Sequence, residues 1–206
     1  MSKFSKPIHK FQKLKKKYNT HFLRLTKSSD YARWRQPHNL HEGWNKRTLR
    51  MAELIPDNSN ILECGNGAGT LASNVPESCT YIGSDIVDKP ANDFTIDLNS
   101  KTFPQLPPHN ILFMSGVLEY IHDVSRLAKE IIGQTETIIC SYTIAGNETK
   151  KADEHDARLR SGFVTHYSEI EFLDKFQKHG WQLEHKEAWY SAVNQLQMIY
   201  VLSAPK

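Results

Sequence analysis

Apolar residues recur at steps of three and four along the first 25 positions, which is the repeat of one face of an α-helix. The positions are Phe4, Ile8, Phe11, Leu14, Tyr18, Phe22 and Leu25. Basic residues fall between them: Lys6, Lys10, Lys13, Lys15, Lys16, Lys17 and Arg24. The pattern predicts an amphipathic helix with a cationic polar side. Three roles fit it: a cap whose apolar face packs on the rest of the chain, an interfacial helix on an anionic membrane, or an arm that binds nucleic acid.

Beyond residue 60 the pattern changes to short apolar runs that alternate with helical stretches. The runs predict strands at 60–64, 80–84, 93–97, 110–115, 136–142, 182–190 and 196–203. Helices are predicted at 44–54, 69–74, 123–133 and 168–179. This alternation indicates an α/β fold with a doubly wound, mostly parallel sheet in three αβα layers. The last two strands follow one another closely and predict an antiparallel hairpin.

Length and charge add a two-part organisation. The 206 residues fit one compact domain with a short appendage, so we expect a basic arm over 1–42 and a folded domain over 43–206. Residues 1–50 hold 14 Lys and Arg against 2 Asp and Glu, whereas the remainder holds 12 against 21. A basic arm on an acidic body favours phosphate-bearing partners.

Targeting signals are not evident in the sequence. It has no run of 18 apolar residues, and no apolar stretch follows its Lys-rich start. The three cysteines form no C-x-x-C pair and predict reduced thiols. These features predict a cytoplasmic protein, with peripheral contact at the inner membrane face through residues 4–25 as an option.

A glycine-rich loop follows the first predicted strand. Its glycines alternate at Gly65, Gly67 and Gly69. They lack the Cβ atoms that would hold a ligand away from the backbone, and they permit positive φ angles. Thr70 breaks the G-x-G-x-x-G fingerprint of dinucleotide sites. Glu63, just before the loop, suits a ligand with an ammonium or sulfonium group better than a pyrophosphate.

A second carboxylate, Asp85, ends the next predicted strand, 22 residues after Glu63. That spacing is close to the roughly 20 residues at which an acidic side chain meets ribose hydroxyls. With this spacing, the glycine loop, Asp97 and the stretch 110–123, the chain resembles the class I S-adenosylmethionine-dependent methyltransferases over about residues 43–203. The resemblance implies a Rossmann-like fold, the cofactor S-adenosylmethionine (SAM) and methyl transfer.

The same resemblance implies a set of cofactor contacts: Glu63, Gly65, Gly67, Gly69, Asp85, Ile86, Asp97 and Ser115. Glu63 and the glycines would face the methionine end, Asp85 the ribose and Asp97 the adenine amine. Asn110 stands where many members have Asp, so no carboxylate role is carried to that position. The stretch 118–122 resembles the Leu-Glu-His segment of the branch that methylates small molecules and sugars, which makes His122 a candidate substrate contact.

The motifs that the sequence lacks narrow the choice of atom that accepts the methyl group. No Asn/Asp-Pro-Pro-aromatic group follows the fourth strand, which disfavours base N-methylation, and no cysteine has the Pro-Cys context of cytosine C5 methylation. A hydroxyl oxygen remains as the acceptor. Its reaction is faster when a base removes the hydroxyl proton as the new bond forms. The loop after the fifth strand supplies the candidates: His155 or His166 as the base and Arg158 and Arg160 for an anionic substrate group. Trp34 is expected either to stack on a sugar ring or base or to be buried where the arm packs.

Three hypotheses follow. The first is O-methylation of a small molecule or of a saccharide in a cell-surface glycan or glycolipid precursor. The second is an RNA methyltransferase whose basic arm grips phosphates. The third is a binding module without catalysis on the same fold. No clustered ligand set indicates a metal.

Overall fold

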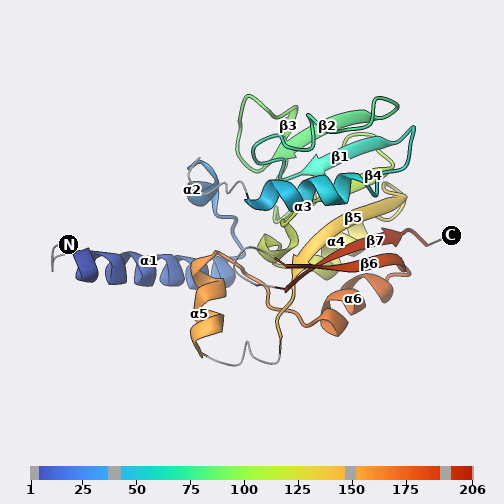
Figure 1. The fold of residues 1–206 in the computed structure, drawn as a ribbon. Helices are drawn as coiled ribbons and strands as arrows, with labels where there is room; N and C mark the ends of the chain where they lie inside the picture. Colours follow the sequence, from blue (N-terminus) through green and yellow to red (C-terminus); the bar gives the residue numbers. More distant parts are fainter. Residues whose placement is uncertain (1–4, 37–42, 147–151, 191–195, 206) are drawn as a thin grey trace.

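The computed structural model describes residues 5–36, 43–146, 152–190 and 196–205 (Figure 1). Its centre is a seven-stranded sheet in the order β3-β2-β1-β4-β5-β7-β6. The strands are β1 (Asn60–Cys64), β2 (Thr80–Asp85), β3 (Phe94–Thr95), β4 (Ile111–Met114), β5 (Thr137–Thr143), β6 (Gln182–Tyr190) and β7 (Leu196–Ser203). All seven lie at the predicted places along the chain.

The pairing of the strands confirms the predicted fold class. Strands β1 to β5 pair in parallel, whereas β7 pairs antiparallel with both β5 and β6. Strand β1 lies between β2 and β4, so the order of the sheet reverses beside β1. In open α/β sheets, ligands bind outside the carboxyl ends of the strands at such a reversal. The crevice for a ligand is therefore expected where β1, β2 and β4 end.

Apolar side chains of successive residues fill two cores, one on each face of the sheet. Leu62 and Leu112 belong to the core under α4 (Val124–Glu130) and α6 (Glu169–Gln177). Ile61 and Ile111 belong to the core under α3 (Gly43–Ala52). This alternation follows from the two-residue period of a strand. Continuous apolar strands such as 111–114 are buried on both faces for this reason.

The helix predicted at 69–74 is absent, and this expectation was wrong. Residues 67–73 form a series of turns. Their backbone bonds span three residues, as from the Gly69 amide to the Asn66 carbonyl (2.8 Å) and from the Asn74 amide to the Leu71 carbonyl (2.7 Å). The Asn74 side chain also donates to the Thr70 carbonyl (2.8 Å), which an α-helix would use for its own ladder. The structure adds three short elements: α2 (Tyr31–Trp34), η2 (Leu118–Tyr120) and α5 (Ala152–Arg160).

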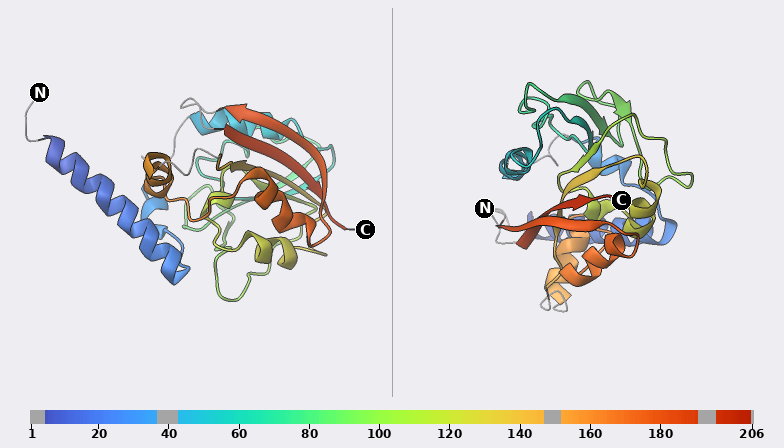
Figure 2. Two further views of the ribbon diagram at one scale, coloured as in Figure 1. Left: turned by 90° about the horizontal axis from the view of Figure 1, so that it is seen from below. Right: turned by 90° about the vertical axis from the view of Figure 1, so that its right-hand side faces the viewer.

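The N-terminal periodicity does form a helix, α1 (Ser5–Thr26), which projects from the body of the protein (Figure 2). The five stripe residues whose side chains are described, from Phe11 to Leu25, are exposed and do not pack on the domain as the cap interpretation expects. Between residues 11 and 26, the buried side chains of α1 are those of Thr20 and Leu23, which lie on another side of the helix. The Thr20 hydroxyl donates to the Leu159 carbonyl of α5 at 2.7 Å. Among the described residues, no helix is both long and apolar enough to cross a membrane.

Candidate active site

The turn after β1 is shaped by its glycines. Gly65, Gly67 and Gly69 all have positive φ angles, between 56° and 77°. The Gly65 amide donates to the Ser84 carbonyl of β2 at 2.8 Å, which fixes the turn against the sheet. A Cβ atom on Gly65 would lie 2.5 Å from a methyl carbon of Val117. Glycine is therefore required at position 65 by both the backbone angle and the close approach of the segment after β4.

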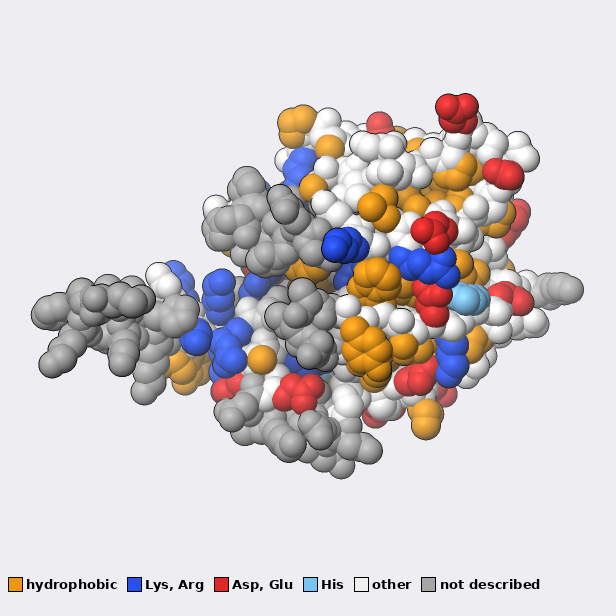
Figure 3. Space-filling view, viewed as in Figure 1, with side chains coloured by type: hydrophobic (Ala, Val, Ile, Leu, Met, Phe, Trp, Pro, Cys, Tyr) orange, Lys and Arg blue, Asp and Glu red, His pale blue; other side chains and the backbone are white. Residues whose placement is uncertain are grey.

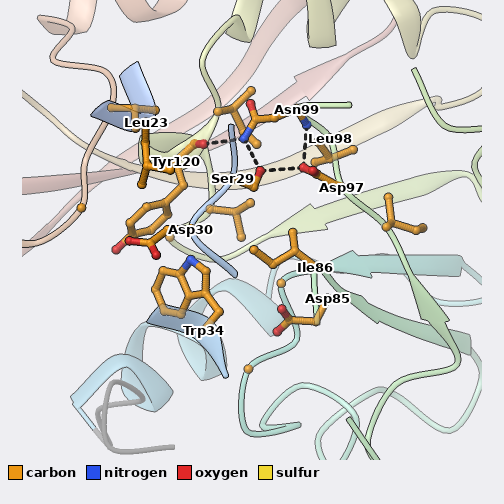
Figure 4. Close-up of a pocket in the computed structure, with 18 of the residues that line it drawn as sticks. Leu23, Ser29, Asp30, Trp34, Asp85, Ile86, Asp97, Leu98, Asn99 and Tyr120 are labelled. Carbon is orange, nitrogen blue, oxygen red and sulfur yellow. Dashed lines mark hydrogen bonds between the residues drawn. The ribbon is translucent and has the colours of Figure 1, made fainter. Parts of the chain in front are cut away.

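A crevice lies beside this turn, as the sheet order predicts (Figure 4). Six of the eight cofactor contacts implied by the sequence line it: Gly65, Gly67, Asp85, Ile86, Asp97 and Ser115. Glu63 lines a second cavity that adjoins the crevice and shares Gly65, Gly67 and Ser115 with it. Gly69 lines neither cavity and acts within the turn. Residues distant in sequence are thus brought to one place.

Asp85 lies at the carboxyl end of β2, in the crevice wall. It is 7% exposed, and its Oδ2 accepts a hydrogen bond from the Lys89 ammonium at 2.7 Å. Its Oδ1 accepts a longer bond from the Val87 amide at 3.4 Å. The carboxylate is thereby held in the wall, and the cationic partner compensates part of its burial.

Asp97 is bound by the N-terminal segment of the chain. Its oxygens accept hydrogen bonds from the hydroxyls of Ser29 (2.7 Å) and Tyr31 (2.6 Å) and from the Asn99 amide (2.9 Å). The bond to Asp97 raises the pKa of Tyr31 to about 12. Figure 4 shows the Ser29 hydroxyl between Asp97 and the Asn99 side chain. The segment before α2 is therefore part of the crevice wall, which the sequence did not reveal.

Glu63 is a buried carboxylate beside the glycine turn. It is 2% exposed, and its Oε2 accepts a hydrogen bond from the Tyr81 hydroxyl at 2.6 Å. Burial raises the pKa of Glu63 to about 7, although the bond from Tyr81 opposes the shift. Without a positive charge nearby, burial favours the protonated, neutral form of Glu63. A cationic ligand favours the charged form instead. The environment thus suits a ligand with a positive charge.

Arg47 of α3 is a second buried charge in the adjoining cavity. It is 4% exposed, and it donates to the Ser115 hydroxyl (3.2 Å) and to the Gln197 side-chain oxygen (3.0 Å). Burial lowers the pKa of its guanidinium. Gly116 leaves the space that Arg47 fills, because a Cβ atom there would lie 2.4 Å from the guanidinium. Sequence reasoning missed Arg47 as a site residue, although residues 30–50 are unusually dense in aromatic and basic side chains, which was the available signal.

The other wall of the crevice is aromatic. The Trp34 ring meets the Tyr120 ring edge-on at 4.8 Å between centroids, and Trp44 lies 6.5 Å from Trp34. Asp30 lies beside Tyr120 in the same wall (Figure 4). Its carboxylate is held by bonds from the Arg33 amide (3.1 Å) and the Arg33 Nε (3.2 Å). Tyr120 belongs to the stretch 118–122 that resembles the Leu-Glu-His segment.

The two candidate bases, His155 and His166, lie next to each other, but neither lines the crevice. The rings of His155 and His166 are 4.7 Å apart between centroids. His166 lines a separate groove at the C-terminal end of α1, and His122 lines the same groove. His122 Nε2 bonds to the Ser28 carbonyl at 3.0 Å. Burial and neighbouring cations lower the pKa of His166 to about 3. Their assignment as bases or substrate contacts stays a prediction.

The candidate arginines occupy different environments. Arg158 is 1% exposed, donates to the carbonyls of Thr143 (2.9 Å) and Ile144 (3.3 Å), and lies 5.1 Å from the Phe163 ring centroid. These contacts connect α5 to the end of β5. The Arg160 carbonyl accepts a bond from Arg33 at 3.1 Å. Neither arginine lines the crevice, and their role in binding an anionic substrate also stays a prediction.

Fold and crevice together define a class: an α/β protein with a ligand-sized crevice at the reversal of its sheet. A family model described as a methyltransferase domain matches residues 31–186. The chain belongs to this family and is a class I SAM-dependent methyltransferase. No curated protein sequence matches the chain.

Several solved structures share this fold at low sequence identity. A SAM-dependent methyltransferase from Mesorhizobium loti is 16% identical with a TM-score of 0.58, over 78% of this chain and 97% of that one. The N-terminal domain of EvdMO1, crystallised with S-adenosylhomocysteine and D-fucose, is 16% identical with a TM-score of 0.53, over 81% and 84%. A protein described as an O-methyltransferase of Nostoc punctiforme is 13% identical with a TM-score of 0.54, over 77% of this chain and 56% of that one. The match thus spans little more than half of the Nostoc chain.

Proposed function

We propose that the protein methylates a hydroxyl group of a small molecule, and that the acceptor is a saccharide or a saccharide-bearing precursor of a cell-surface glycan or glycolipid. The observation that carries this proposal is one crevice with carboxylates on one side and an aromatic wall on the other. Sugar rings pack on aromatic side chains through their apolar faces. The neighbour crystallised with D-fucose and the neighbour described as an O-methyltransferase support the same substrate class.

The residues present fit the cofactor. The Gly65 turn leaves no Cβ between ligand and backbone, Glu63 provides a buried carboxylate for a positive charge, and Asp85 provides acceptors for ribose hydroxyls. We assign Arg47 to the carboxylate of the methionine end, because it is the buried cation of the adjoining cavity. When bound, SAM supplies an electrophilic methyl group for an in-line displacement.

The chain's own task is then to align the acceptor and exclude water. Trp34 and Tyr120 form the flat wall against which an acceptor ring lies. Asp30 is the carboxylate of that wall, and we assign it to accept a hydrogen bond from the reacting hydroxyl. Arg33 holds Asp30 in place through two hydrogen bonds. We place the enzyme in the cytoplasm.

Calorimetry and a methyl-transfer assay with labelled SAM test the proposal. The purified full chain is expected to bind SAM and to label saccharide hydroxyls in preference to RNA. Trp34→Ala is expected to raise the KM for the acceptor at least tenfold and to leave the SAM Kd within about threefold, because its ring lies on the acceptor side. Tyr190→Ala, a change of an exposed aromatic residue on β6, is the control.

Two outcomes would contradict the proposal. Absence of SAM binding would favour the module without catalysis, and labelling of RNA alone would favour the nucleic-acid hypothesis. Preferential release of bound protein from RNA by salt would accompany the second outcome.

A further inference from the structure

The apolar stripe of α1 remains uncovered in the folded protein. Four of its residues are more than half exposed: Phe11 (70%), Tyr18 (67%), Phe22 (62%) and Leu25 (84%). Leu14 continues the stripe and is 43% exposed. Contiguous apolar side chains on a soluble protein mark an interaction surface. The stripe is therefore a candidate docking surface.

The contact between α1 and the body leaves the stripe facing away. Successive residues of an α-helix are about 100° apart, so Tyr18 and Thr20 lie on opposite sides of α1. Thr20 is fully buried against α5, and Lys17 makes an ion pair with Asp156 of α5 at 2.6 Å. Turning the helix to bury the stripe would break both contacts. The left view of Figure 2 shows α1 standing away from the sheet along most of its length.

The charges of α1 indicate the occupant. Helix α1 contains seven Lys and Arg and no Asp or Glu. Within the described part of the chain, Lys13, Lys15 and Lys16 have no carboxylate within ion-pair distance, whereas Lys17 does. Figure 3 shows blue side chains gathered where α1 meets the body. The surface thus combines exposed apolar rings with uncompensated positive charge.

We propose that α1 docks on an anionic phospholipid bilayer, with its apolar stripe inserted at the level of the headgroups. An anionic membrane covers the apolar residues and attracts the cations of the same helix at the same time. A second copy would bring two sets of seven cations together with no acidic residue between them. Nucleic acid would neutralise the cations but leave Phe11, Phe22 and Leu25 in water.

The docked helix lies next to the crevice along the chain. Leu25 belongs to the exposed stripe, whereas Leu23 lines the crevice. The chain then passes from Lys27 into Ser29 and Asp30, which also line it. Docking therefore anchors at the membrane the helix that leads directly into the crevice wall. This step requires no methyl transfer, so it is tested independently of the proposed function.

Co-sedimentation of the full chain with vesicles tests the proposal. Vesicles of phosphatidylcholine with phosphatidylglycerol are compared with vesicles of phosphatidylcholine alone. We expect binding to the anionic vesicles only, weakened by added salt, with each basic residue near the surface contributing roughly fivefold. Lys15→Gln with Lys16→Gln is therefore expected to weaken binding at least tenfold.

The stripe itself is tested with a matched pair of variants. Leu25→Ser on α1 is expected to weaken binding to anionic vesicles about tenfold, and Phe22→Ser with Leu25→Ser further still. Ile170→Ser is the control, because Ile170 of α6 is exposed to the same degree (82% against 84%) but lies outside α1. All these side chains are exposed, so the thermal midpoint of unfolding is expected to stay unchanged.

Two results would overturn the proposal. One is binding to anionic vesicles that Phe22→Ser with Leu25→Ser leaves unaltered. The other is a dimer in analytical ultracentrifugation that the same variant dissociates, without vesicle binding by the unaltered chain. Calorimetric titration with SAM on the same samples shows whether the cofactor site is intact, which separates failure of docking from failure of the proposed function.

Discussion

Glu63 offers the sharpest test of the cofactor site, because its buried carboxylate changes charge near neutral pH. Burial raises its pKa from 4.5 to about 7 in the ligand-free protein. The proposed function places a sulfonium and an ammonium group close to it. A cationic ligand stabilises the charged carboxylate, so binding is expected to lower the pKa of Glu63 again. The affinity for SAM must then rise with pH.

The magnitude follows from linkage. If binding returns the pKa of Glu63 to its ordinary value, the affinity rises about fifteenfold between pH 5.5 and pH 7.0. The same shift makes the charged form unfavourable in the free protein. Because the folded pKa is raised, the stability that protonated Glu63 contributes is present below pH 4.5 and is lost as the pH rises through 7. The shift of about 2.5 units corresponds to about 3 kcal/mol in the free energy of unfolding.

Glu63→Gln separates the two effects. Glutamine stays neutral and still accepts the bond from the Tyr81 hydroxyl, so the variant is expected to unfold at higher temperature than the wild type at pH 8. It is also expected to bind SAM more weakly and without the rise between pH 5.5 and pH 7.0. The calorimetric titrations are limited to pH 7.0 and below. The α-amino group of SAM itself loses its proton near pH 8, which would also change the affinity. Glu77→Gln, at an exposed carboxylate, is the control.

An affinity that stays flat from pH 5.5 to pH 7.0 in the wild type would refute the assignment of Glu63 to the cationic end. The same slope in the wild type and in Glu63→Gln would also refute it. A stabilised variant that binds SAM normally would show that Glu63 is buried for another reason.

Three further changes test other parts of the site. Asp85→Ala is expected to weaken SAM by roughly 1.5–3 kcal/mol, the range for a hydrogen bond to a charged group, and an unchanged calorimetric Kd would remove Asp85 from the site. Gly65→Ala is expected to lower stability by more than 1 kcal/mol in thermal unfolding, and adding Val117→Ala to restore only part of it, because the φ of +77° remains. Tyr31→Phe is expected to strengthen SAM binding a few-fold, because it frees an oxygen of Asp97; weaker binding would assign Tyr31 itself to the ligand.

The sheet was predictable from sequence because its strands are short apolar runs with no helical period. Five strands in parallel and one terminal hairpin follow from the order of those runs and from the short loop before 196–203. The segment 69–74 was not predictable in this way, because side-chain bonds such as that from Asn74 to the Thr70 carbonyl decide between turn and helix. Propensity patterns do not register such local competition.

The cofactor side of the site was predictable because it is carried by a contiguous motif and by the ends of adjacent strands. Gly65, Gly67 and Asp85 meet in the crevice for this reason. The opposite wall is built by residues whose only connection is tertiary. Asp30 comes from the segment before α2, and Tyr120 comes from η2. No spacing in the sequence relates these two positions, which is why the candidate acceptor wall required the structure.

In the N-terminal segment, the helix was predicted correctly from its periodicity, but the side of the helix that packs on the body was not. The steps of three and four predicted α1, but a helical period only states that the apolar residues share a side. Which side meets the body was decided by Thr20, a polar residue, through its bond to the Leu159 carbonyl. A buried hydroxyl is acceptable when its donor is satisfied, so Thr20 can occupy the contact while five large apolar residues stay outside. The described part of the apolar stripe is not used by the fold of the chain itself, and these exposed residues are the physical basis on which we propose a bilayer as the partner of α1.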